Sequence, residues 1–312
     1  MTDDPQPDPD TRTAPQHPLS PRQTLSYLRE LFASHGIRPK NKLGQSFLID
    51  LNLIDLIVRV ANLSKDDLAI EVGSGTGSLT ARLAAAAGAV LSVEIDPAFA
   101  DLTKETLGER DNVVLLHHDI LRNKNELRAD VLTALEELRQ RSGCTKLKLV
   151  SNLPYAVAVP VLSNFLLSGL PFDRMVTTVQ WEIAERLIAR PGTKDYGALA
   201  VLVQSLTHVE LIRRLPPSVF FPRPQVASAI MRIFPSAKKR EHVGDVLKFR
   251  SFLRDLYTHR RKNLRGALVG LPDKRFGKEE VDARLAELGL EGTIRAEALD
   301  LEQHLRLCAV FG

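Results

Sequence analysis

The stretch that decides the fold is Ala69-Ile-Glu-Val-Gly-Ser-Gly-Thr-Gly77, an apolar run that passes directly into a glycine-rich loop. Glycine at positions 73, 75 and 77 allows the backbone to turn tightly from a strand into a helix and to approach a ligand closely. A glycine string of this kind is weak evidence alone, because ordinary turns also contain it. Its interpretation therefore depends on the segments further along the chain.

Strand-like and helical patterns alternate on both sides of this loop. Further strand-like runs occur at residues 90–94, 113–117, 147–150, 175–179, 206–211 and 229–233. Helical patterns fill most of the gaps between the first five strands, and others are expected at 22–35, 51–61 and 125–141. This alternation predicts the α/β class, with a doubly wound, Rossmann-like parallel sheet. The last two runs are not separated by an obvious long helix, so an antiparallel pair is expected at one edge.

Composition divides the chain into three parts. Residues 1–21 are rich in proline and aspartate, cannot bury apolar surface, and are expected to form a disordered tail. Residues 22–236 are expected to form the main domain, including a basic loop at 38–48. Residues 237–312 show helical stripes without strand-like alternation, which predicts a smaller all-helical C-terminal domain.

The folded part is more basic than the whole chain. The net charge is +4, but the first 20 residues hold four aspartates against one arginine, so the remainder carries +7. Between residues 238 and 265 there are ten lysines and arginines against three acids. The apolar side chains Phe249, Phe252, Leu253, Leu256 and Tyr257 form the opposite face of the same helix, which leaves the basic face free to meet phosphates.

Several classes of protein are excluded by what the chain lacks. Its two cysteines, Cys144 and Cys308, lie far apart and form no metal-ligand pattern, and its eight histidines form no ligand cluster, so no metal is expected. No apolar run approaches the length of a membrane span, and the N-terminus lacks the features of a signal peptide. A soluble, cytoplasmic protein is expected, and a monomer is the simplest assumption.

A nucleotide site is indicated at the carboxyl ends of the first strands. Glu94 closes the second strand, about one βαβ unit beyond the glycine loop, where a carboxylate accepts hydrogen bonds from ribose hydroxyls. Asp119 follows the third strand and is placed to accept from an adenine amino group, although capping of the next helix explains it equally well. Glu71 beside the loop repels a pyrophosphate but suits a sulfonium and an ammonium, which favours S-adenosylmethionine over a dinucleotide.

A second site follows the strand at 147–150, in the sequence Asn152-Leu153-Pro154-Tyr155. The amide oxygen of Asn152 and the carbonyl of Leu153 can accept hydrogen bonds from a planar amine, and Tyr155 can stack on its ring. Such a cradle orients the nitrogen lone pair toward a methyl donor, with Pro154 stiffening the turn. The pattern predicts methylation of an exocyclic nucleobase amine.

With these residues together, the chain closely resembles the family of small-subunit (16S) ribosomal RNA adenine N6,N6-dimethyltransferases. The resemblance runs from about Pro39 to Gly266 and includes Lys42–Leu48, Glu71–Gly77, Val93–Asp96, Asn152–Tyr155, Val179–Arg186, Lys194–Gly197, Pro216–Val226 and Arg260–Leu264. It implies that S-adenosylmethionine is used to dimethylate two adjacent adenosines in a hairpin of small-subunit rRNA, during assembly of the small subunit. The partner implied is this rRNA or the assembling subunit.

The resemblance also assigns roles to residues of this chain. The catalytic positions are Asn152, Leu153, Pro154, Tyr155 and, as a second clamp on the target base, Phe220, for which core packing is the competing role. The cofactor positions are Ser46, Leu48, Glu71, Gly73, Gly75, Gly77, Glu94, Asp119 and Asn152. The expected RNA contacts are Lys40, Lys42, Arg223, Lys248, Arg254, Arg260, Arg261, Lys262 and Arg265.

Three positions depart from the family pattern, which often has asparagine at the places of Ser46 and Ala156 and aspartate at the place of Ala227. None of them touches the expected chemistry directly, so they bear on fine specificity. Two other functions stay open. One is a large-subunit rRNA adenine methyltransferase of the macrolide-resistance kind. The segments 194–197 and 260–264 favour the small-subunit family over it. The other is a non-catalytic rRNA-binding assembly factor.

Overall fold

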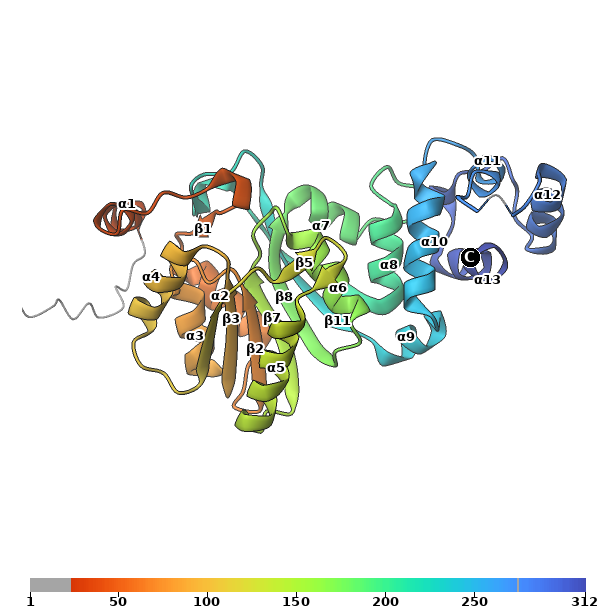
Figure 1. Ribbon diagram of the computed structural model, residues 1–312. Coiled ribbons are helices and arrows are strands. Elements are labelled where there is room, and N and C mark those ends of the chain that lie inside the picture. The colour runs from red at the N-terminus through yellow and green to blue at the C-terminus, as the bar shows by residue number, and fades with distance from the viewer. Residues whose placement is uncertain (1–23, 274) are drawn as a thin grey trace, which may run out of the picture.

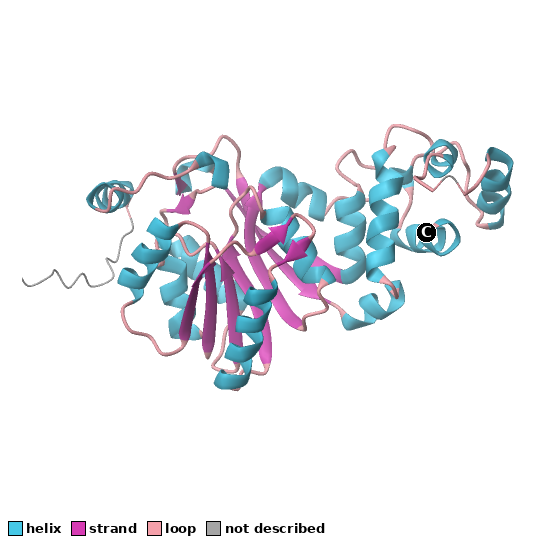
Figure 2. Cartoon of the chain, viewed as in Figure 1, coloured by secondary structure: helices cyan, strands magenta, loops and turns pink. Residues whose placement is uncertain are grey.

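The computed structural model describes residues 24–273 and 275–312, so the expected tail at residues 1–21 lies outside the described residues. A central sheet is flanked by helices on both faces, and the C-terminal helices gather beyond one side of the sheet (Figure 1). This arrangement confirms the predicted α/β class with a helical C-terminal region. Figure 2 shows the strands as one twisted fan between the two layers of helices.

The main sheet is largely parallel. Its strands are β2 (Asp67–Val72), β3 (Ala89–Glu94), β4 (Val113–His117), β7 (Lys146–Asn152), β8 (Phe172–Gln180), β9 (Thr207–Leu215) and β11 (Ser228–Pro235). Within the described residues they are seven strands in the order β4-β3-β2-β7-β8-β11-β9. The first five run parallel, whereas β11 is antiparallel to both β8 and β9. The predicted antiparallel pair at the edge is confirmed, with β11 inserted between β8 and β9.

Alternation along the strands divides the sheet between two layers of helices. On β2, for example, Ala69 packs in one apolar cluster with helix α2, whereas Leu68 and Ile70 pack in another with α5 and α6. All residues of β2 are buried, because both faces of a parallel sheet are covered. The carboxyl edge of the sheet is thereby left as the place where loops can form a site.

The helices follow the strands as the sequence predicts. They are α1 (Leu25–Ser34), α2 (Leu51–Ala61), α3 (Ser78–Ala86), α4 (Pro97–Leu107), α5 (Ala129–Ser142), α6 (Ala158–Leu167), α7 (Trp181–Leu187), α8 (Ala198–Leu206), α9 (Ala237–Val243), α10 (Val246–Thr258), α11 (Leu264–Val269), α12 (Lys278–Glu287) and α13 (Leu301–Phe311). Polar side chains define several starts, because Thr24, Asp50, Asp96 and Asp300 each accept a hydrogen bond from the first turn.

One predicted helix begins later than expected. The helix predicted from residue 125 begins at Ala129, and a small hairpin of β5 (Leu121–Asn123) and β6 (Glu126–Leu127) precedes it. Leu127 is 6% exposed in this hairpin, so its spacing fitted a helical stripe although it belongs to a strand. The error arose because a few apolar residues satisfy both periods over a short stretch.

The C-terminal helices pack directly on the sheet domain. The predicted buried face of α10 is confirmed for Phe249, Phe252, Leu253 and Leu256, each at most 4% exposed, and Tyr257 is half-buried. These side chains belong to the same apolar cluster as α6, α8 and β11. The core is therefore continuous across residue 236, where the composition of the sequence changes, and α8 links the two parts.

A two-stranded sheet joins two loops above the main sheet. β1 (Phe47–Leu48) pairs antiparallel with β10 (Phe220–Phe221), placing Leu48 opposite Phe220. Phe47 packs in a separate cluster with Phe32 of α1 and Phe99 of α4. The N-terminal segment is thus fixed at the carboxyl edge of the main sheet by residues that lie far from it in sequence.

Candidate active site

The glycine loop is held close to two other segments of the predicted site. Gly73 and Gly75 have φ angles of +84° and +55°, a region that residues with a side chain rarely adopt. A Cβ atom at Gly73 would lie 3.0 Å from Cγ of Pro154, and one at Gly75 would lie 2.7 Å from the ring of Phe47. Glycine is required here both by backbone conformation and by the close approach of the neighbouring loops.

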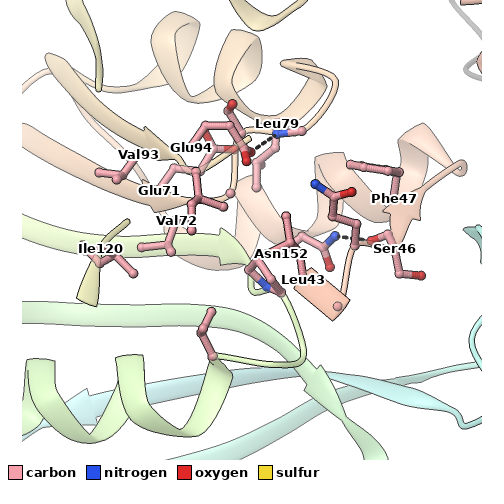
Figure 3. A pocket seen from close by; sticks show the side chains of 18 of the residues that line it. Leu43, Ser46, Phe47, Glu71, Val72, Leu79, Val93, Glu94, Ile120 and Asn152 are labelled. Atoms are coloured by element: carbon pink, nitrogen blue, oxygen red, sulfur yellow. Dashed lines mark hydrogen bonds between the residues drawn. The ribbon is translucent and has the colours of Figure 1, made fainter. Parts of the chain in front are cut away.

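A cavity opens over the carboxyl ends of β2, β3, β4 and β7 (Figure 3). Its walls bring together most of the cofactor positions predicted from the sequence, namely Ser46, Leu48, Glu71, Gly73, Gly75, Glu94, Asp119 and Asn152. Gly77 does not line the cavity and instead forms the N-cap of α3. Of the second predicted site, Asn152 and Pro154 line the same cavity, as does Ala156, whereas Leu153 and Tyr155 do not.

Glu71 is fully buried at the base of the glycine loop. Its Oε2 accepts hydrogen bonds of 2.6 Å from both Thr80 and Ser92, and its Oε1 is buried without a partner. Burial raises the pKa of Glu71 to about 7, against the effect of the two hydroxyls. This corrects the electrostatic argument from the sequence, which assumed a full negative charge: near neutral pH the carboxyl group is only partly ionised unless a cation is bound beside it.

Glu94 ends β3 as predicted and is 4% exposed. Its Oε2 accepts a hydrogen bond of 3.0 Å from the Gly75 amide, and its Oε1 accepts one of 2.9 Å from the Asp96 amide. Burial raises the pKa of Glu94, while these two backbone donors oppose the shift. Each carboxylate oxygen has a second lone pair, so the group can still accept from a ligand hydroxyl.

Asp119 lies in the turn between β4 and the β5–β6 hairpin. Its Oδ1 accepts a hydrogen bond of 2.9 Å from the Leu121 amide. The helix-capping role considered from the sequence is therefore wrong, because the side chain stabilises a turn that leads into β5, and the next helix, α5, begins after Arg128. The residue also lines the cavity, so this hydrogen bond and a contact to a ligand are compatible.

The side chain of Asn152 is held from two sides. Its Nδ2 donates a hydrogen bond of 2.9 Å to the carbonyl of Ser46 (Figure 3), and its Oδ1 accepts one from the hydroxyl of Thr178. An amide oxygen has two lone pairs, so one stays available to a substrate. No hydrogen bond to the carbonyl of Leu153 is found in the part of the chain that the structure describes, so this oxygen can also accept.

Tyr155 is half-buried, and its hydroxyl lies 2.6 Å from the hydroxyl of Ser228. Burial raises the pKa of Tyr155, so the phenol is neutral at physiological pH. Because Ser228 begins β11 beside β8, the pair fixes the tyrosine ring to the central sheet. The amide backbone of Tyr155 also donates to the carbonyl of Gly44, 3.4 Å away, which joins the N-terminal loop to this turn.

Phe220 lies in the core in this structure. It is 2% exposed and packs with Leu48, Leu215 and Ile230, and it does not line the cavity. The core-packing role considered from the sequence is therefore the one observed. Stacking on a target base stays a prediction that requires the 216–226 loop to move.

Several contacts within the site could not be predicted from the sequence. Lys40 forms an ion pair of 2.9 Å with Asp96, and Gln45 donates to the same carboxylate at 3.1 Å, so these residues close the N-terminal loop over β3. The hydroxyl of Ser46 donates to the carbonyl of Pro222 at 2.9 Å, which ties the N-terminal loop to the loop after β10. Thr178 and Ser228 were missed because only the pairing of β7, β8 and β11 brings them to Asn152 and Tyr155.

The nine predicted RNA-binding residues fall into two groups. Five have exposed side chains without a hydrogen-bond or ion-pair partner among the described residues: Lys42, Arg223, Lys248, Arg261 and Lys262. The other four are held in ion pairs within the protein, Lys40 with Asp96, Arg254 with Asp255, Arg260 with Glu297, and Arg265 with Asp282. The first group is free to meet phosphates, whereas the second is already paired with acids of the protein.

Two further properties concern what the described residues do not contain. Within 24–273 and 275–312, no three His, Cys, Asp or Glu side chains lie together as a metal site requires. The helices in the same ranges include none with the length and apolar character needed to cross a membrane.

Comparison with known proteins places the chain in a family. Residues 36–311 match the family described as ribosomal RNA adenine dimethylase. The chain belongs to this family. It is therefore a methyltransferase of the kind that uses S-adenosylmethionine to dimethylate adenine in ribosomal RNA, as the resemblance predicted.

Relatives of the adenine dimethylase family are similar over nearly their whole length. A Geobacillus thermodenitrificans protein named ribosomal RNA small subunit methyltransferase A is 38% identical over 280 residues, which cover 89% of this chain and 93% of that protein. A protein of the same name from Pediococcus pentosaceus is 38% identical over 285 residues, covering 89% and 92%.

Solved structures agree with the fold. A dimethyladenosine transferase from Plasmodium falciparum superposes with a TM-score of 0.67 at 22% identity, covering 85% of this chain and 97% of that one. The 23S rRNA methyltransferase ErmE superposes with a TM-score of 0.58 at 26% identity, covering 85% and 99%.

The cavity fits the cofactor of the adenine dimethylase family. Gly73 and Gly75 line the cavity without a side chain, so a ligand can lie against their backbone. The buried, unpaired Oε1 of Glu71 lacks the partner that a cationic group would supply. Glu94 and Asp119 add acceptors on the same wall for hydroxyl and amino groups.

Proposed function

We propose that this protein dimethylates N6 of two adjacent adenosines in a hairpin of small-subunit rRNA, acting as a cytoplasmic monomer without a metal during small-subunit assembly. The observation that supports it most directly is the orientation of Asn152: Ser46 and Thr178 hold its amide beside the glycine loop. The names of the relatives at 38% identity support the small subunit as the source of the RNA.

The walls of the cavity divide between cofactor and base. Glu71, Glu94, Asp119 and the glycine loop hold S-adenosylmethionine, together with the N-terminal loop at Ser46 and Leu48. The bound cofactor supplies an electrophilic methyl group. Because Asn152 and Pro154 line the same cavity, the target amine reaches this methyl group from the side of β7.

Binding of the target base begins with its extrusion from the RNA, since an amine inside a stack is out of reach. The ring of Tyr155, fixed through Ser228, offers a stacking face. The free lone pair of Asn152 Oδ1 and the carbonyl of Leu153 accept the two N6 hydrogens. Positioning of this kind supplies roughly 7–11 kcal/mol in favourable cases.

Removal of the N6 proton needs no strong base from the protein. The side chains that contact Asn152 or Tyr155 are hydroxyls, those of Thr178 and Ser228, and the pKa of the Tyr155 phenol is raised by burial. Methyl transfer leaves N6 as a positively charged, aniline-like ammonium. This ammonium is acidic, so water accepts its proton. Ala156, exposed and small at the cavity wall, leaves space for a monomethylated amine to bind again.

Replacement of Asn152 tests this assignment. Asn152→Ala is expected to abolish methylation of small subunits while leaving RNA affinity within about twofold, because only the amine loses its acceptor. Asn164→Ala is the matched control: its amide also donates to a carbonyl, that of Lys124, but lies on α6 outside the cavity. Unchanged turnover of Asn152→Ala would exclude the mechanism.

A second candidate function, methylation of adenine in large-subunit rRNA, is favoured by the likeness to the 23S rRNA methyltransferase ErmE. Incubation of the protein with purified small and large subunits and labelled methyl donor separates the two, and label in the large subunit alone would support the second. A non-catalytic assembly factor predicts no label in either subunit. Calorimetry with S-adenosylmethionine then tests whether the cavity binds the cofactor at all.

A further inference from the structure

Trp181 and Arg214 form a cation–π pair beside the proposed base site. The guanidinium carbon of Arg214 lies 4.4 Å from the centre of the Trp181 ring. Arg214 is exposed, and the indole, at the start of α7, is half-buried against the core. No ion pair or hydrogen bond involves the Arg214 side chain in the described residues, so the outer face of the guanidinium plane is open.

This pair lies directly next to the residues that position the amine. The amide of Trp181 donates to the carbonyl of Ala227 at 2.8 Å, and the following residue, Ser228, holds the Tyr155 hydroxyl. Trp181 also follows the end of β8 closely, three positions after Thr178, which holds Asn152. Trp181 thus directly follows β8, which carries Thr178, and is hydrogen-bonded to the residue that directly precedes β11, which begins with Ser228.

The electrostatic surroundings suit a nucleic acid. Arg214 and Arg223 are exposed and form no ion pair in the described part of the chain. Two acids lie on α7: Glu182, 3.7 Å from Arg186, and exposed Glu185. A flat cation whose charge is not neutralised, backed by an indole, is the kind of surface on which nucleobases stack.

We propose that Arg214, held flat by Trp181, stacks on the base of the nucleotide next to the target adenosine. The base, guanidinium and indole form three parallel layers at the carboxyl end of β9. The stack keeps the RNA in register after one base has been extruded into the cavity. The inference rests on the proposed RNA substrate, because it concerns a neighbour of the methylated nucleotide.

Two charge-conserving variants test the proposal. Arg214→Lys retains the positive charge but loses the plane, and is expected to raise KM for immature small subunits about tenfold, with kcat within about twofold. Arg213→Lys is the matched control, because Arg213 is the adjacent exposed residue of β9. Arg213 pairs with Ile230 and Arg214 with Ala229, so the two side chains lie on opposite faces of the strand. Arg213→Lys is expected to leave KM unchanged. Equal KM values for both variants would contradict the stack.

Tryptophan emission provides a second measurement, because Trp181 is the single tryptophan of the chain. Titration of the wild-type protein with an oligoadenylate of about six nucleotides should change the emission as the base stacks onto the pair. Emission that stays constant at saturating oligoadenylate would overturn the proposal. Methylation of small subunits by the wild-type protein is measured in parallel: its absence would contradict the proposed function, whereas its presence with constant emission would contradict the stack alone.

Discussion

The side-chain nitrogen of Asn152 donates a hydrogen bond to the main-chain carbonyl of Ser46, 2.9 Å away and 106 positions earlier in the chain. This bond couples the N-terminal loop to the carboxyl end of β7. It also sets the direction of the amide, since its nitrogen faces Ser46 and its oxygen faces Thr178. The N-terminal loop that lines the cavity therefore also orients the amide that we propose receives the amine.

Thr178 is expected to affect catalysis through Asn152. Thr178→Val removes the hydroxyl donor from a fully buried position with little change of volume. The amide then loses one of its two restraints, and we expect kcat to fall about tenfold with KM for RNA unchanged. Thr177→Val is the control on the same strand, because the Thr177 hydroxyl is buried without a partner. A fall in kcat of the same size in both variants would contradict the positioning role.

The hydroxyl pair of Tyr155 and Ser228 is expected to orient the ring and not to transfer a proton. Tyr155→Phe and Ser228→Ala each remove one hydroxyl of the 2.6 Å contact, and each should lower kcat/KM roughly three- to tenfold. The double variant should lose little more than either single variant, because the two groups act on one interaction. Rates measured across the pH range should show no new titration. Fully additive losses would show that the hydroxyls act separately.

Gly75 is expected to tolerate no side chain. Gly75→Ala places Cβ 2.7 Å from the Phe47 ring at a φ of +55°, whereas Gly143→Ala meets no atom within 4 Å at a φ of +67°. Gly143→Ala should cost about 1–2 kcal/mol of unfolding free energy for the backbone alone. Gly75→Ala should cost about 1–3 kcal/mol more for the contact. Denaturant titration measures both, and equal losses would show that the Phe47 contact is unimportant.

Glu71 is expected to make stability fall as pH rises. Its pKa is raised in the folded state from 4.5 to about 7, so between these values the folded protein binds more protons than the unfolded chain. The stabilisation that Glu71 contributes is fully present below pH 4.5 and is lost as the pH rises through about 7. Glu71→Gln should reduce the decline measured by denaturant titration between about pH 5 and pH 8. Some decline should remain, because the pKa of Glu94 is also raised.

The same group predicts how the cofactor responds to pH. A cationic ligand beside Glu71 favours the ionised carboxylate, so binding of S-adenosylmethionine should strengthen as pH rises through 7. Calorimetry should show a weaker pH dependence in Glu71→Gln. The same pH dependence in both proteins would place the cation elsewhere in the cavity.

Salt dependence should separate the two groups of basic residues. Arg261 is exposed and without an ion pair, so Arg261→Gln should reduce the slope of log affinity against log salt by roughly 0.7–0.9. Arg265 is paired with Asp282 at 2.5 Å, and Arg265→Gln should leave the slope nearly unchanged while lowering stability. Filter binding at several salt concentrations measures the slopes. An equal reduction in both variants would show that the ion pair opens on RNA.

Much of the fold followed from local patterns. The strands at residues 69–72 and 90–94 and the α10 face at Phe249 and Phe252 were predicted because period and burial agree within each element. The start of α5 was predicted too early, since Leu127 of the hairpin also fits the helical stripe. The position of β11 between β8 and β9 could not be read from order along the chain, because strand order is decided by long-range pairing.

The sequence by itself determined the residues proposed to bear the chemistry: the glycine loop, Glu94, Asp119 and the Asn152–Tyr155 turn. These are recognisable because each follows a strand and all carboxyl ends of a parallel sheet meet at one edge. Only the tertiary structure decided how they are held. It assigned Thr178 to Asn152, Ser228 to Tyr155 and Arg214 to Trp181, and it placed Phe220 in the core, because each of these contacts joins residues that the chain itself keeps far apart.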